Sequence, residues 1–400
     1  MNPAAVLALA ASAAALPAGE GGAASLCGLC HPDVRVQYET SIHRSEEISC
    51  VSCHGGDPSA GDVAGAHGRG FRGRVRRAGI PDLCASCHAD AGIMRPYNLP
   101  TDQLALYRTS AHGRLLARGD DRAAVCTDCH GAHDIRSARD PSSRVHSLNV
   151  PQTCARCHSD ASLRAAFGHL GDPYADFAAS VHGEALLRRG NLSAPDCSRC
   201  HGAHGAAPPG MGDVDKVCGQ CHQTARYWFR TGPHATAMAR EGMSECASCH
   251  GHHATAAAPV SLLETACSGC HAAGTAPLEL ASRMKTLYDG AGEEIETARA
   301  LVDKAARVPL YVEDYRARLQ EADTSLIESL PTMHSLDLSR VEHLTARARS
   351  IGREVQAEVN GKLGDRAWRR LGLAAFWFYL LVTVAILARR RRRWAGGGGR

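Results

Sequence analysis

Every cysteine in the 400-residue sequence belongs to one kind of motif. The eighteen cysteines form nine C-x-x-C pairs, and a histidine directly follows each pair. C-x-x-C-H is the attachment site of c-type haem, in which both thiols form thioether bonds with the porphyrin and the histidine ligates the iron. The sequence therefore predicts nine covalently attached haem c groups.

These nine motifs supply two sets of predicted binding residues. The predicted thioether cysteines are Cys27, Cys30, Cys50, Cys53, Cys84, Cys87, Cys126, Cys129, Cys154, Cys157, Cys197, Cys200, Cys218, Cys221, Cys246, Cys249, Cys267 and Cys270. The predicted proximal iron ligands are His31, His54, His88, His130, His158, His201, His222, His250 and His271. No cysteine is left over for a catalytic thiol, and no catalytic residue is predicted.

Two other uses of paired cysteines fit the sequence less well. A structural zinc site takes two such pairs, so nine pairs would leave one unmatched, and zinc gives no reason for a histidine after every pair. A disulfide between cysteines this close in sequence would be strained and redox-active. Haem attachment accounts for the cysteines and the histidines together.

Thirteen further histidines are available as second, distal ligands of the irons. His43, His112, His182 and His234 each precede a motif, whereas His133, His204 and His252 closely follow one. A histidine so close to its own proximal ligand cannot reach the opposite face of the same haem, so we expect it to ligate a neighbouring haem. The alternative role is a surface histidine that solvates a haem propionate. The sequence leaves five more candidates open: His67, His146, His169, His253 and His334.

The motifs recur as an internal repeat, which is the unit to recognise before any secondary structure. The clearest copy begins with Ser110-Ala111-His112-Gly113, continues with a motif extended to C-x-x-C-H-G-A-H, and ends with a second C-x-x-C-H at His158. A second clear copy begins at Ser180 and ends at His222. Looser copies lie on either side, so that four two-motif repeats follow one solitary motif that ends at His31.

This repeat resembles the doubled-CXXCH, class III multihaem cytochromes c over about residues 26–272. Their kin include small tetrahaem carriers, membrane-anchored quinol-oxidising cytochromes and octahaem reductases. The resemblance implies periplasmic electron transfer through stacked, mostly bis-histidine haems. The chain departs from that pattern in its nine motifs and in a C-terminal segment that carries no motif.

The composition supports a fold organised by cofactors. Aromatic residues make up only 5% of the chain, which is few for an ordinary core, and the net charge of +4 gives no indication of nucleic-acid binding. We expect a mostly α-helical fold with long loops and stacked haems, including a helix over Thr101–Arg118, followed by an α-helical segment and one transmembrane helix.

Both ends of the chain predict an exported, membrane-bound protein. Residues 1–25 are predicted to be a signal peptide, and 26–275 a nonahaem domain. Leu371–Ala388 is long enough to span a bilayer and lies within a predicted transmembrane helix at 368–390. Five arginines, Arg389–Arg393, lie at the end of this helix and the start of the predicted basic tail, 391–400. The positive-inside rule then places the C-terminus in the cytoplasm and the haem domain in the periplasm, at a bacterial inner membrane.

Residues 276–367 are predicted to form an α-helical stalk or bundle. Apolar residues at helical spacing indicate helices over about 278–307 and 312–330, and a third that starts at a capping box, Ser339–Glu342, and continues toward the span. Proline residues are expected to end the first two helices, at Pro309 and Pro331. A dimer formed through these helices is the alternative to a stalk.

Three functions are compatible with these features. The first is an electron carrier that serves other redox proteins or a quinol-oxidising membrane complex; the seven methionines are not placed regularly near motifs, which favours histidine ligation. The second is a multihaem reductase or oxidase of a small nitrogen or sulfur compound, with one open haem site. The third, a filament-forming cytochrome, is disfavoured by the membrane span. The motifs favour the electron carrier, because none of them is degenerate and no C-x-x-C-K occurs.

Overall fold

The computed structural model describes residues 25–168, 171–209 and 213–395. The predicted signal peptide lies outside this part of the chain except for Ser25, as does His169. The described residues form helices, turns and loops, and they contain no β-strand. The expectation of a mostly α-helical chain with long loops is confirmed for these residues.

The contacts divide the chain into two compact units. The N-terminal unit extends to Pro209 and also includes His252–Ala256, whereas the C-terminal unit takes the remaining residues after Pro209. The division therefore falls between motifs: six motifs lie in the N-terminal unit, and the last three lie in the C-terminal unit with the helices that follow them.

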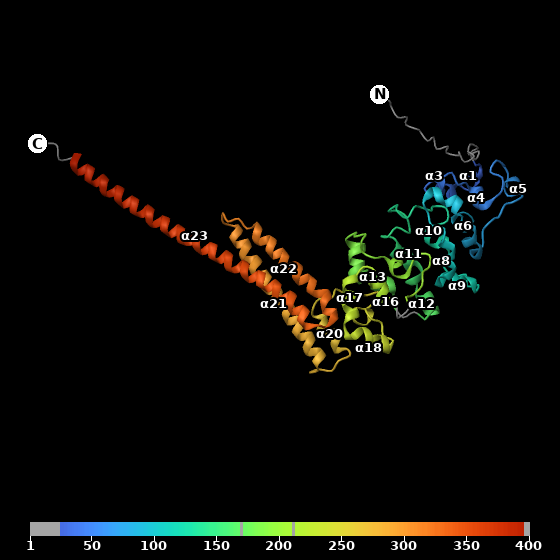
Figure 1. The fold of residues 1–400 in the computed structure, drawn as a ribbon. Helices are drawn as coiled ribbons and strands as arrows, with labels where there is room; N and C mark the ends of the chain where they lie inside the picture. The colour runs from blue at the N-terminus through green and yellow to red at the C-terminus, as the bar shows by residue number, and fades with distance from the viewer. Residues whose placement is uncertain (1–24, 169–170, 210–212, 396–400) are drawn as a thin grey trace, which may run out of the picture. The chain divides into compact units, whose positions relative to one another are not determined.

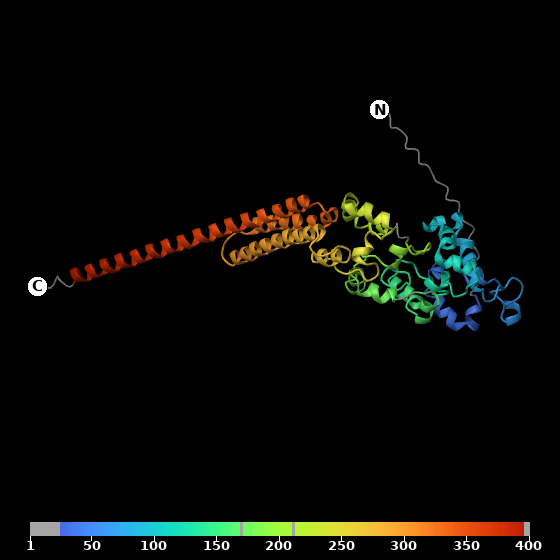
Figure 2. The same ribbon diagram turned by 90° about the horizontal axis from the view of Figure 1, so that it is seen from below.

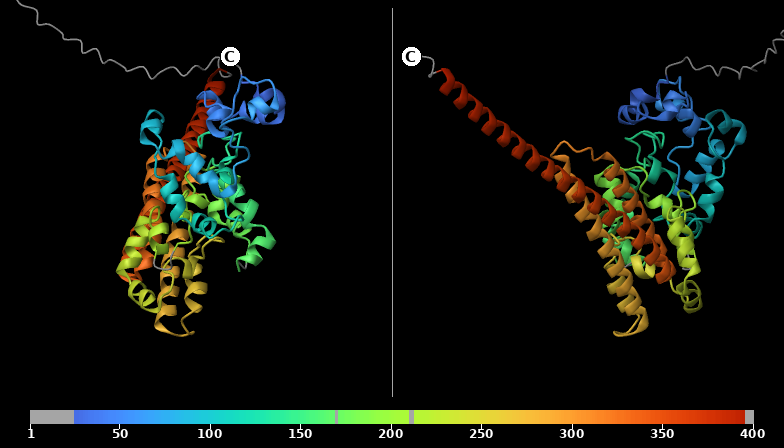
Figure 3. Two further views of the ribbon diagram at one scale, coloured as in Figure 1. Left: turned by 90° about the vertical axis from the view of Figure 1, so that its right-hand side faces the viewer. Right: turned by 60° about the vertical axis from the view of Figure 1, so that its left-hand side comes forward.

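The helices of the N-terminal unit are short and joined by loops (Figure 3). Most motifs form a helical turn of their own or end a slightly longer helix, so the two thiols and the histidine project from one turn. The α-helices are α1 (Cys27–Cys30), α2 (Pro32–Tyr38), α3 (Ile42–Ser45), α4 (Cys50–His54), α5 (Val63–Ala66), α6 (Ile80–His88), α7 (Ala91–Met94), α8 (Gln103–Thr109), α9 (Ala111–Ala117), α10 (Cys126–His130), α11 (Val150–His158), α12 (Ala161–Ala166), α13 (Pro173–Ala179), α14 (Val181–Gly183) and α15 (Cys197–His201). Shorter turns are η1 (Arg77–Gly79), η2 (Arg95–Tyr97) and η3 (Glu184–Arg188).

The single helix predicted over Thr101–Arg118 is wrong, because the chain turns a corner at Ser110. The Ser110 backbone is extended, at φ −69° and ψ 165°, and separates α8 from α9. Its hydroxyl donates to the Tyr107 carbonyl at 2.6 Å and accepts from the Gly113 N–H at 2.9 Å. A serine that caps the second helix therefore overrides the apolar periodicity that runs through both.

Few apolar side chains of the N-terminal unit are buried. Among its described residues, the buried apolar side chains are Met94, Ala123, Val125, Leu186 and two prolines, Pro81 and Pro151. A unit of this size cannot be stabilised by so small a core, since burial of apolar surface is the main favourable contribution to folding. The protein atoms alone therefore leave this unit without the interior that it needs.

The C-terminal unit begins with five helices around the last three motifs. These are α16 (Val214–Cys218), α17 (Gln223–Thr231), α18 (Pro233–Glu241), α19 (Ala247–His250) and α20 (Leu262–Ser268). Three long helices follow: α21 (Ala276–Ala306), α22 (Glu313–Thr332) and α23 (Leu338–Ala395), with the turn η5 (Met333–Ser335) between α22 and α23.

The three long helices lie side by side along much of their length (Figures 1 and 2). Their shared core repeats at helical spacing on each helix, as the sequence predicted. Ion pairs flank that core, including those of Arg318 with Glu354 and Glu358 between α22 and α23. The core consists of Ala291, Ile295, Ala298, Val302, Ala305, Val312, Tyr315, Leu319, Ala322, Leu326, Ala348, Val355 and Val359.

Two predicted helix ends differ from those in the structure. Pro331 lies inside the last turn of α22 and does not end it, because the helix continues to Thr332. The predicted capping box at Ser339 is also wrong, since α23 already begins at Leu338. Asp337 acts as the cap instead: its carboxylate accepts from the Ser339 N–H at 3.0 Å and from the Ser339 hydroxyl at 2.6 Å.

Helix α23 continues without a break past the loop that joins α21 and α22 (Figure 1). Its Leu338–Arg392 stretch is the one helix among the described residues that is long and apolar enough to cross a membrane. Large apolar side chains in its second half are exposed, for example Leu371 at 62% and Phe378 at 71%. An apolar surface of this extent requires a partner or a lipid environment.

Removal of residues 371–400 is expected to release the protein from the membrane. Large apolar side chains in the deleted stretch, such as Leu371 and Phe378, are exposed, and the core of the three helices lies before residue 371, so haem attachment and helical content per residue should be unchanged. Fractionation in detergent-free buffer, with haem absorbance as the readout, measures the partition. A chain that ends at Arg393 keeps the apolar stretch and serves as the control; a 371–400 deletion that stayed in the membrane fraction would overturn the assignment.

Candidate haem-binding sites

Histidine side chains face each other in pairs throughout both units. Eight such pairs have ring centroids 5.8 to 6.2 Å apart, and each pair contains one motif histidine and one histidine from elsewhere in the chain. The pairs are His31 with His67, His88 with His43, His54 with His133, His158 with His112, His130 with His204, His201 with His253, His271 with His234, and His250 with His334.

This separation matches the distance that one metal ion between two imidazoles requires. A metal–imidazole nitrogen bond is about 2 Å long and the ring centroid lies about 1 Å behind the nitrogen, so two opposed rings have centroids about 6 Å apart. Rings that packed directly on each other would lie closer, as the His67 and Phe71 rings do at 4.2 Å. The eight pairs are therefore spaced to hold an atom between them.

The pairs follow two rules along the repeats. We name the repeats by their two motif histidines: repeat A has His54 and His88, repeat B His130 and His158, repeat C His201 and His222, and repeat D His250 and His271. In repeats A, B and D, the histidine that precedes the repeat lies opposite its second motif, as His112 lies opposite His158. His182 holds the corresponding sequence position in repeat C.

The second rule joins consecutive repeats. The histidine that follows the first motif of one repeat lies opposite the first motif of the repeat before it. His133 of repeat B lies opposite His54 of repeat A, and His204 of repeat C lies opposite His130 of repeat B. The structure thus brings these histidines to a neighbouring motif, which is where their sequence positions direct them.

For repeat D, the structure favours His253 and not the predicted His252. The His253 ring lies 5.8 Å from that of His201, whereas His252 packs edge-on against His253. The His252 Nδ1 atom accepts the backbone N–H of His253 at 2.9 Å, so the proton of the neutral ring is on Nε2 and that nitrogen cannot ligate a metal. Two adjacent histidines could not be distinguished by the repeat pattern, which tolerates an offset of one residue.

Two of the candidates that the sequence left open also lie in pairs. His67 faces His31 of the solitary first motif, and His334, in the turn between α22 and α23, faces His250. His146 instead accepts the Leu148 N–H through Nδ1 at 3.4 Å. His67 lies between the two motifs of repeat A and, by the second rule, faces the motif before that repeat, whereas His334 lies outside every repeat, so periodicity could not single it out.

The segments that begin at Ser41, Ser110 and Ser180 place their histidines by a shared local structure. Ser41, Ser110 and Ser180 are buried caps, and in the latter two the hydroxyl accepts the N–H of the glycine three residues later. That glycine is needed for space. A Cβ atom on Gly113 or Gly183 would lie 2.0 Å from the carbonyl oxygen of the residue six positions earlier. Serine and glycine together fold a sharp helical corner that fixes the histidine between them.

A backbone hydrogen bond then joins each corner to the next repeat. The residue before the upstream histidine of one repeat donates its N–H to a carbonyl of the next repeat. That carbonyl lies two residues after the histidine that follows the first motif of the next repeat. The three bonds are Ile42 to Ile135 at 2.8 Å, Ala111 to Ala206 at 2.9 Å and Val181 to Thr255 at 2.9 Å. The third bond places His253, not His252, in register with His133 and His204.

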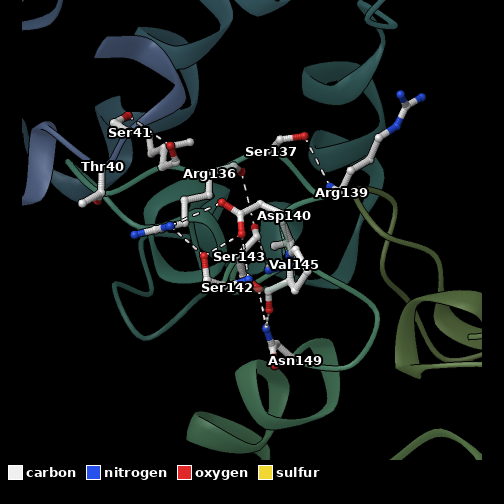
Figure 4. Close-up of polar contacts among 12 residues, drawn as sticks. Thr40, Ser41, Arg136, Ser137, Arg139, Asp140, Ser142, Ser143, Val145 and Asn149 are labelled. Atoms are coloured by element: carbon white, nitrogen blue, oxygen red, sulfur yellow. Dashed lines mark hydrogen bonds and ion pairs between the residues drawn. The ribbon is translucent and has the colours of Figure 1, made fainter. Parts of the chain in front are cut away.

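The loop that receives the first of these bonds is held by its own polar contacts (Figure 4). Ser41 also donates its hydroxyl to the Ile135 carbonyl at 3.1 Å. Arg136 bonds Ser142 at 2.7 Å and pairs with Asp140 at 3.3 Å, and the Asn149 amide donates to the Ser143 carbonyl at 2.8 Å. This network fixes the stretch between the two motifs of repeat B and with it the position of His133.

The motif histidines are oriented by the turn that they end. Gly131 follows His130 with φ +83°, and a Cβ atom there would lie 2.3 Å from Asp134 Oδ1, so only glycine fits. In two motifs a backbone carbonyl accepts the Nδ1 proton: Gly73 from His54 at 3.1 Å and Ala207 from His201 at 3.2 Å. This bond leaves Nε2 unprotonated and free to ligate a metal.

Burial favours the neutral, metal-ligating form of several paired histidines. Burial, with the neighbouring His204 and His88, lowers the pKa of His130 to about 4. Burial also lowers the pKa of His43, His88 and His112. Neutral imidazoles do not repel each other as two imidazolium ions would, so the pairs are electrostatically suited to share one metal ion.

Consecutive motifs lie next to each other in the N-terminal unit. A hydrogen bond with Cys126 raises the pKa of the Cys84 thiol, and one with Cys197 does the same for Cys154. Burial and the nearby Cys27 raise the pKa of Cys50, and burial and the nearby Cys87 raise that of Cys53. Cys129 lies near Cys154, which joins the two motifs of repeat B, so the thiols of the first six motifs form a continuous series in chain order.

The donor set fits haem and does not fit zinc. In the part of the chain that the structure describes, no three His, Cys, Asp or Glu side chains are grouped to hold a metal ion, and a structural zinc ion needs four ligands. Two axial histidines with two cysteines beside one of them are instead the protein ligands of a bis-histidine c-type haem. The missing apolar core of the N-terminal unit fits the same group, since a porphyrin is large and mostly apolar.

The comparison with protein families agrees with this donor set. Residues 190–227 match the family described as Doubled CXXCH motif. This segment carries a doubled CXXCH motif. The motif indicates a multihaem c-type cytochrome, a class of extracytoplasmic electron-transfer proteins that bind haem c. No curated protein and no solved structure matches the chain.

Replacement of Gly113 by Ala is expected to displace His112 from His158. The added methyl group would lie 2.0 Å from the Tyr107 carbonyl oxygen and 3.0 Å from the Arg108 Cα atom, and these are backbone atoms that cannot move aside as a side chain can, so the corner must open. The holoprotein should then contain a haem that binds carbon monoxide in the reduced state, which optical titration measures. Arg118→Ala, at the exposed end of the same helix, is the control and should bind none; an unchanged G113A spectrum would contradict the assigned role of the corner.

Proposed function

We propose that the chain is a membrane-anchored periplasmic cytochrome c that passes electrons along nine haems, each held between two histidines. The observation that carries the proposal is the set of eight histidine pairs at about 6 Å, each of which joins a motif histidine to a second histidine. His182 is proposed as a further distal ligand, because its sequence position and its capping serine match those of His112.

Bis-histidine ligation favours electron transfer over catalysis. Each haem, when bound, supplies an iron that exchanges single electrons between the ferrous and ferric states. The two histidines of each pair would both ligate that iron and would leave it no coordination site for a substrate. Histidine ligands also hold the potential low, in comparison with the methionine ligand that raises it in other cytochromes c. The paired histidines therefore support a conduit of low potential.

The order of the motifs supports a linear path within the N-terminal unit. Cysteines of the first six motifs lie beside one another in chain order, and each thioether would attach a porphyrin edge at that point. Cross-ligation between repeats reinforces this order, because the histidine that follows one motif reaches back to the preceding repeat. Electrons would then pass from motif to motif in the sequence order of this unit.

Helix α23 is the proposed membrane anchor. Its exposed apolar stretch is followed by arginines from Arg389 onward, and the positive-inside rule would place these in the cytoplasm. The haem-bearing part would then lie in the periplasm, where c-type cytochromes function. Other redox proteins or a quinol-oxidising membrane complex are the proposed partners, and the long helices offer a surface for a dimer.

An open haem site would change this assignment to a reductase or oxidase of a small nitrogen or sulfur compound. The wild-type protein is expected to carry nine covalent haems by intact mass and haemochrome assay, all low-spin, because every iron has two histidines. It should bind no carbon monoxide when reduced and should not turn over nitrite or hydroxylamine. Six or fewer haems would defeat the proposed count, and a high-spin haem with turnover of either substrate would establish the enzyme.

The two histidines of repeat D provide a matched test of ligand assignment. His253→Ala is expected to leave the haem on Cys197–His201 with one histidine, so that one haem per chain becomes high-spin and binds one carbon monoxide. His252→Ala should change neither property, because His252 is bonded to the backbone through Nδ1. Electron paramagnetic resonance and carbon monoxide titration at a constant haem count distinguish the variants, and the reverse outcome would return the assignment to His252.

A further inference from the structure

The first motif of repeat D has no following repeat to supply its distal histidine. In the preceding repeats, this ligand comes from the histidine that follows the first motif of the next repeat: His133 for His54, His204 for His130 and His253 for His201. Beyond repeat D the sequence contains no further C-x-x-C-H. The distal position at His250 must therefore be filled from outside the repeats or stay open.

The turn between α22 and α23 brings a histidine to that position. His334 lies in η5, and its ring centroid is 6.0 Å from that of His250. Its Nδ1 atom is 3.0 Å from the Pro331 carbonyl, an acceptor that holds the proton on Nδ1. In the neutral imidazole of His334, Nε2 is therefore the nitrogen that can ligate a metal, as in the motif histidines that donate to backbone carbonyls.

The residues on both sides of His334 are fixed by packing and hydrogen bonds. Met333 is buried in a cluster with Met284 of α21 and Val341 of α23, and Leu263 of α20 packs against the same cluster. Ser335 is buried and donates its hydroxyl to the Thr332 carbonyl at 2.7 Å. Leu336 then ends the turn in the left-handed conformation, at φ 55°. These contacts leave the imidazole little freedom, which is characteristic of a positioned ligand and not of a mobile surface loop.

The same turn also takes the place of the next repeat in its backbone contacts. In repeats A to C, the segment before the upstream histidine lies against the loop that carries the downstream histidine. Upstream of repeat D, Pro233 has no N–H to donate, and Gly232 lies against η5 instead. A Cβ atom on Gly232 would be 2.9 Å from the His334 carbonyl oxygen and 3.0 Å from that of Ser335. Glycine is therefore required for this close approach.

A cation–π contact fastens the same region to the start of α23. The Arg340 guanidinium lies 4.8 Å from the centre of the Trp228 ring of α17, the helix that precedes Gly232. Helix α17 and the glycine after it thus contact the start of α23 at Arg340 and the turn itself at His334 and Ser335.

We propose that His334 is the distal ligand of the haem attached at Cys246 and Cys249, so that the helical segment completes the haem array. The inference rests on the proposed bis-histidine function and extends it to a residue that lies outside every repeat. The C-terminal helices then have a second role besides attachment to the membrane, because they close the coordination of one iron.

The test compares two histidines of the helical segment in the full-length holoprotein. His334→Ala should keep nine covalent haems but convert one haem to the high-spin state, and carbon monoxide bound per reduced chain should rise from zero to one. His343→Ala is the control, since His343 is exposed on α23, and it should bind none. A His334→Ala protein with only low-spin haems and no carbon monoxide binding would overturn the inference.

A second variant tests the inference if the His334→Ala protein accumulates poorly. His334→Met retains a side chain that can ligate iron, so all haems should stay low-spin while the potential of one haem rises, as redox titration measures. Unchanged potentials would overturn the inference. If His253→Ala opens a haem and His334→Ala does not, only the role of His334 fails; if neither does so, or if the wild type has fewer haems, the proposed function itself fails.

Discussion

The opposition of two imidazoles at about 6 Å is the constraint on which this structure depends. One ring of each pair is fixed by a C-x-x-C-H turn. The other ring belongs to a separate segment, which must hold it about 6 Å away with its unprotonated nitrogen toward the first ring. The corners at Ser110 and Ser180, the glycines after the motifs and the backbone bonds to Ile135, Ala206 and Thr255 all serve this end. Few apolar side chains in the N-terminal unit are buried, so under the proposed function haem ligation would take over the role that side-chain burial has in most proteins.

The C-terminal unit shows the opposite balance. Its three long helices bury small and branched apolar residues along a common seam, and Arg318 with its two glutamates flanks them. This part needs no cofactor to account for its packing. The two modes meet in the cluster of Met284, Met333 and Val341, where the packed helices hold the turn that presents His334 to a motif.

The sequence predicts one half of each site better than the other half. The proximal residues follow from a spacing that has a single strong chemical explanation, and the recurrence of a histidine before each repeat made His43, His112 and His234 visible as candidates. His252 was preferred to His253 because a repeat pattern does not resolve adjacent residues; the backbone bond at Thr255 does. His334 could not be found by periodicity, since it belongs to no repeat and is brought near His250 only by the folding of helices far along the chain.

The helices themselves were predicted where apolar spacing was uninterrupted and mispredicted where one residue changed the backbone. The long helices α21 and α22 lie close to their expected ranges. The helix over 101–118 was divided by the capping hydroxyl of Ser110, and α23 starts before its expected cap because Asp337 provides a better one. Short polar side chains that bond to the backbone decide these ends, and their effect depends on tertiary contacts that spacing does not reveal.

The exchange of histidines between successive repeats has a consequence for how such a chain can change in length. Each repeat gives one imidazole to the repeat before it and receives one from the repeat after it, so an internal copy can be duplicated or deleted as a whole without leaving an orphan. Repeat A likewise gives His67 to the solitary first motif, so only the end of the array breaks this symmetry, where His334 takes the place of the absent neighbour. His334 and its turn correspond to the capping module of a solenoid protein, which finishes a repetitive stack with non-repetitive sequence.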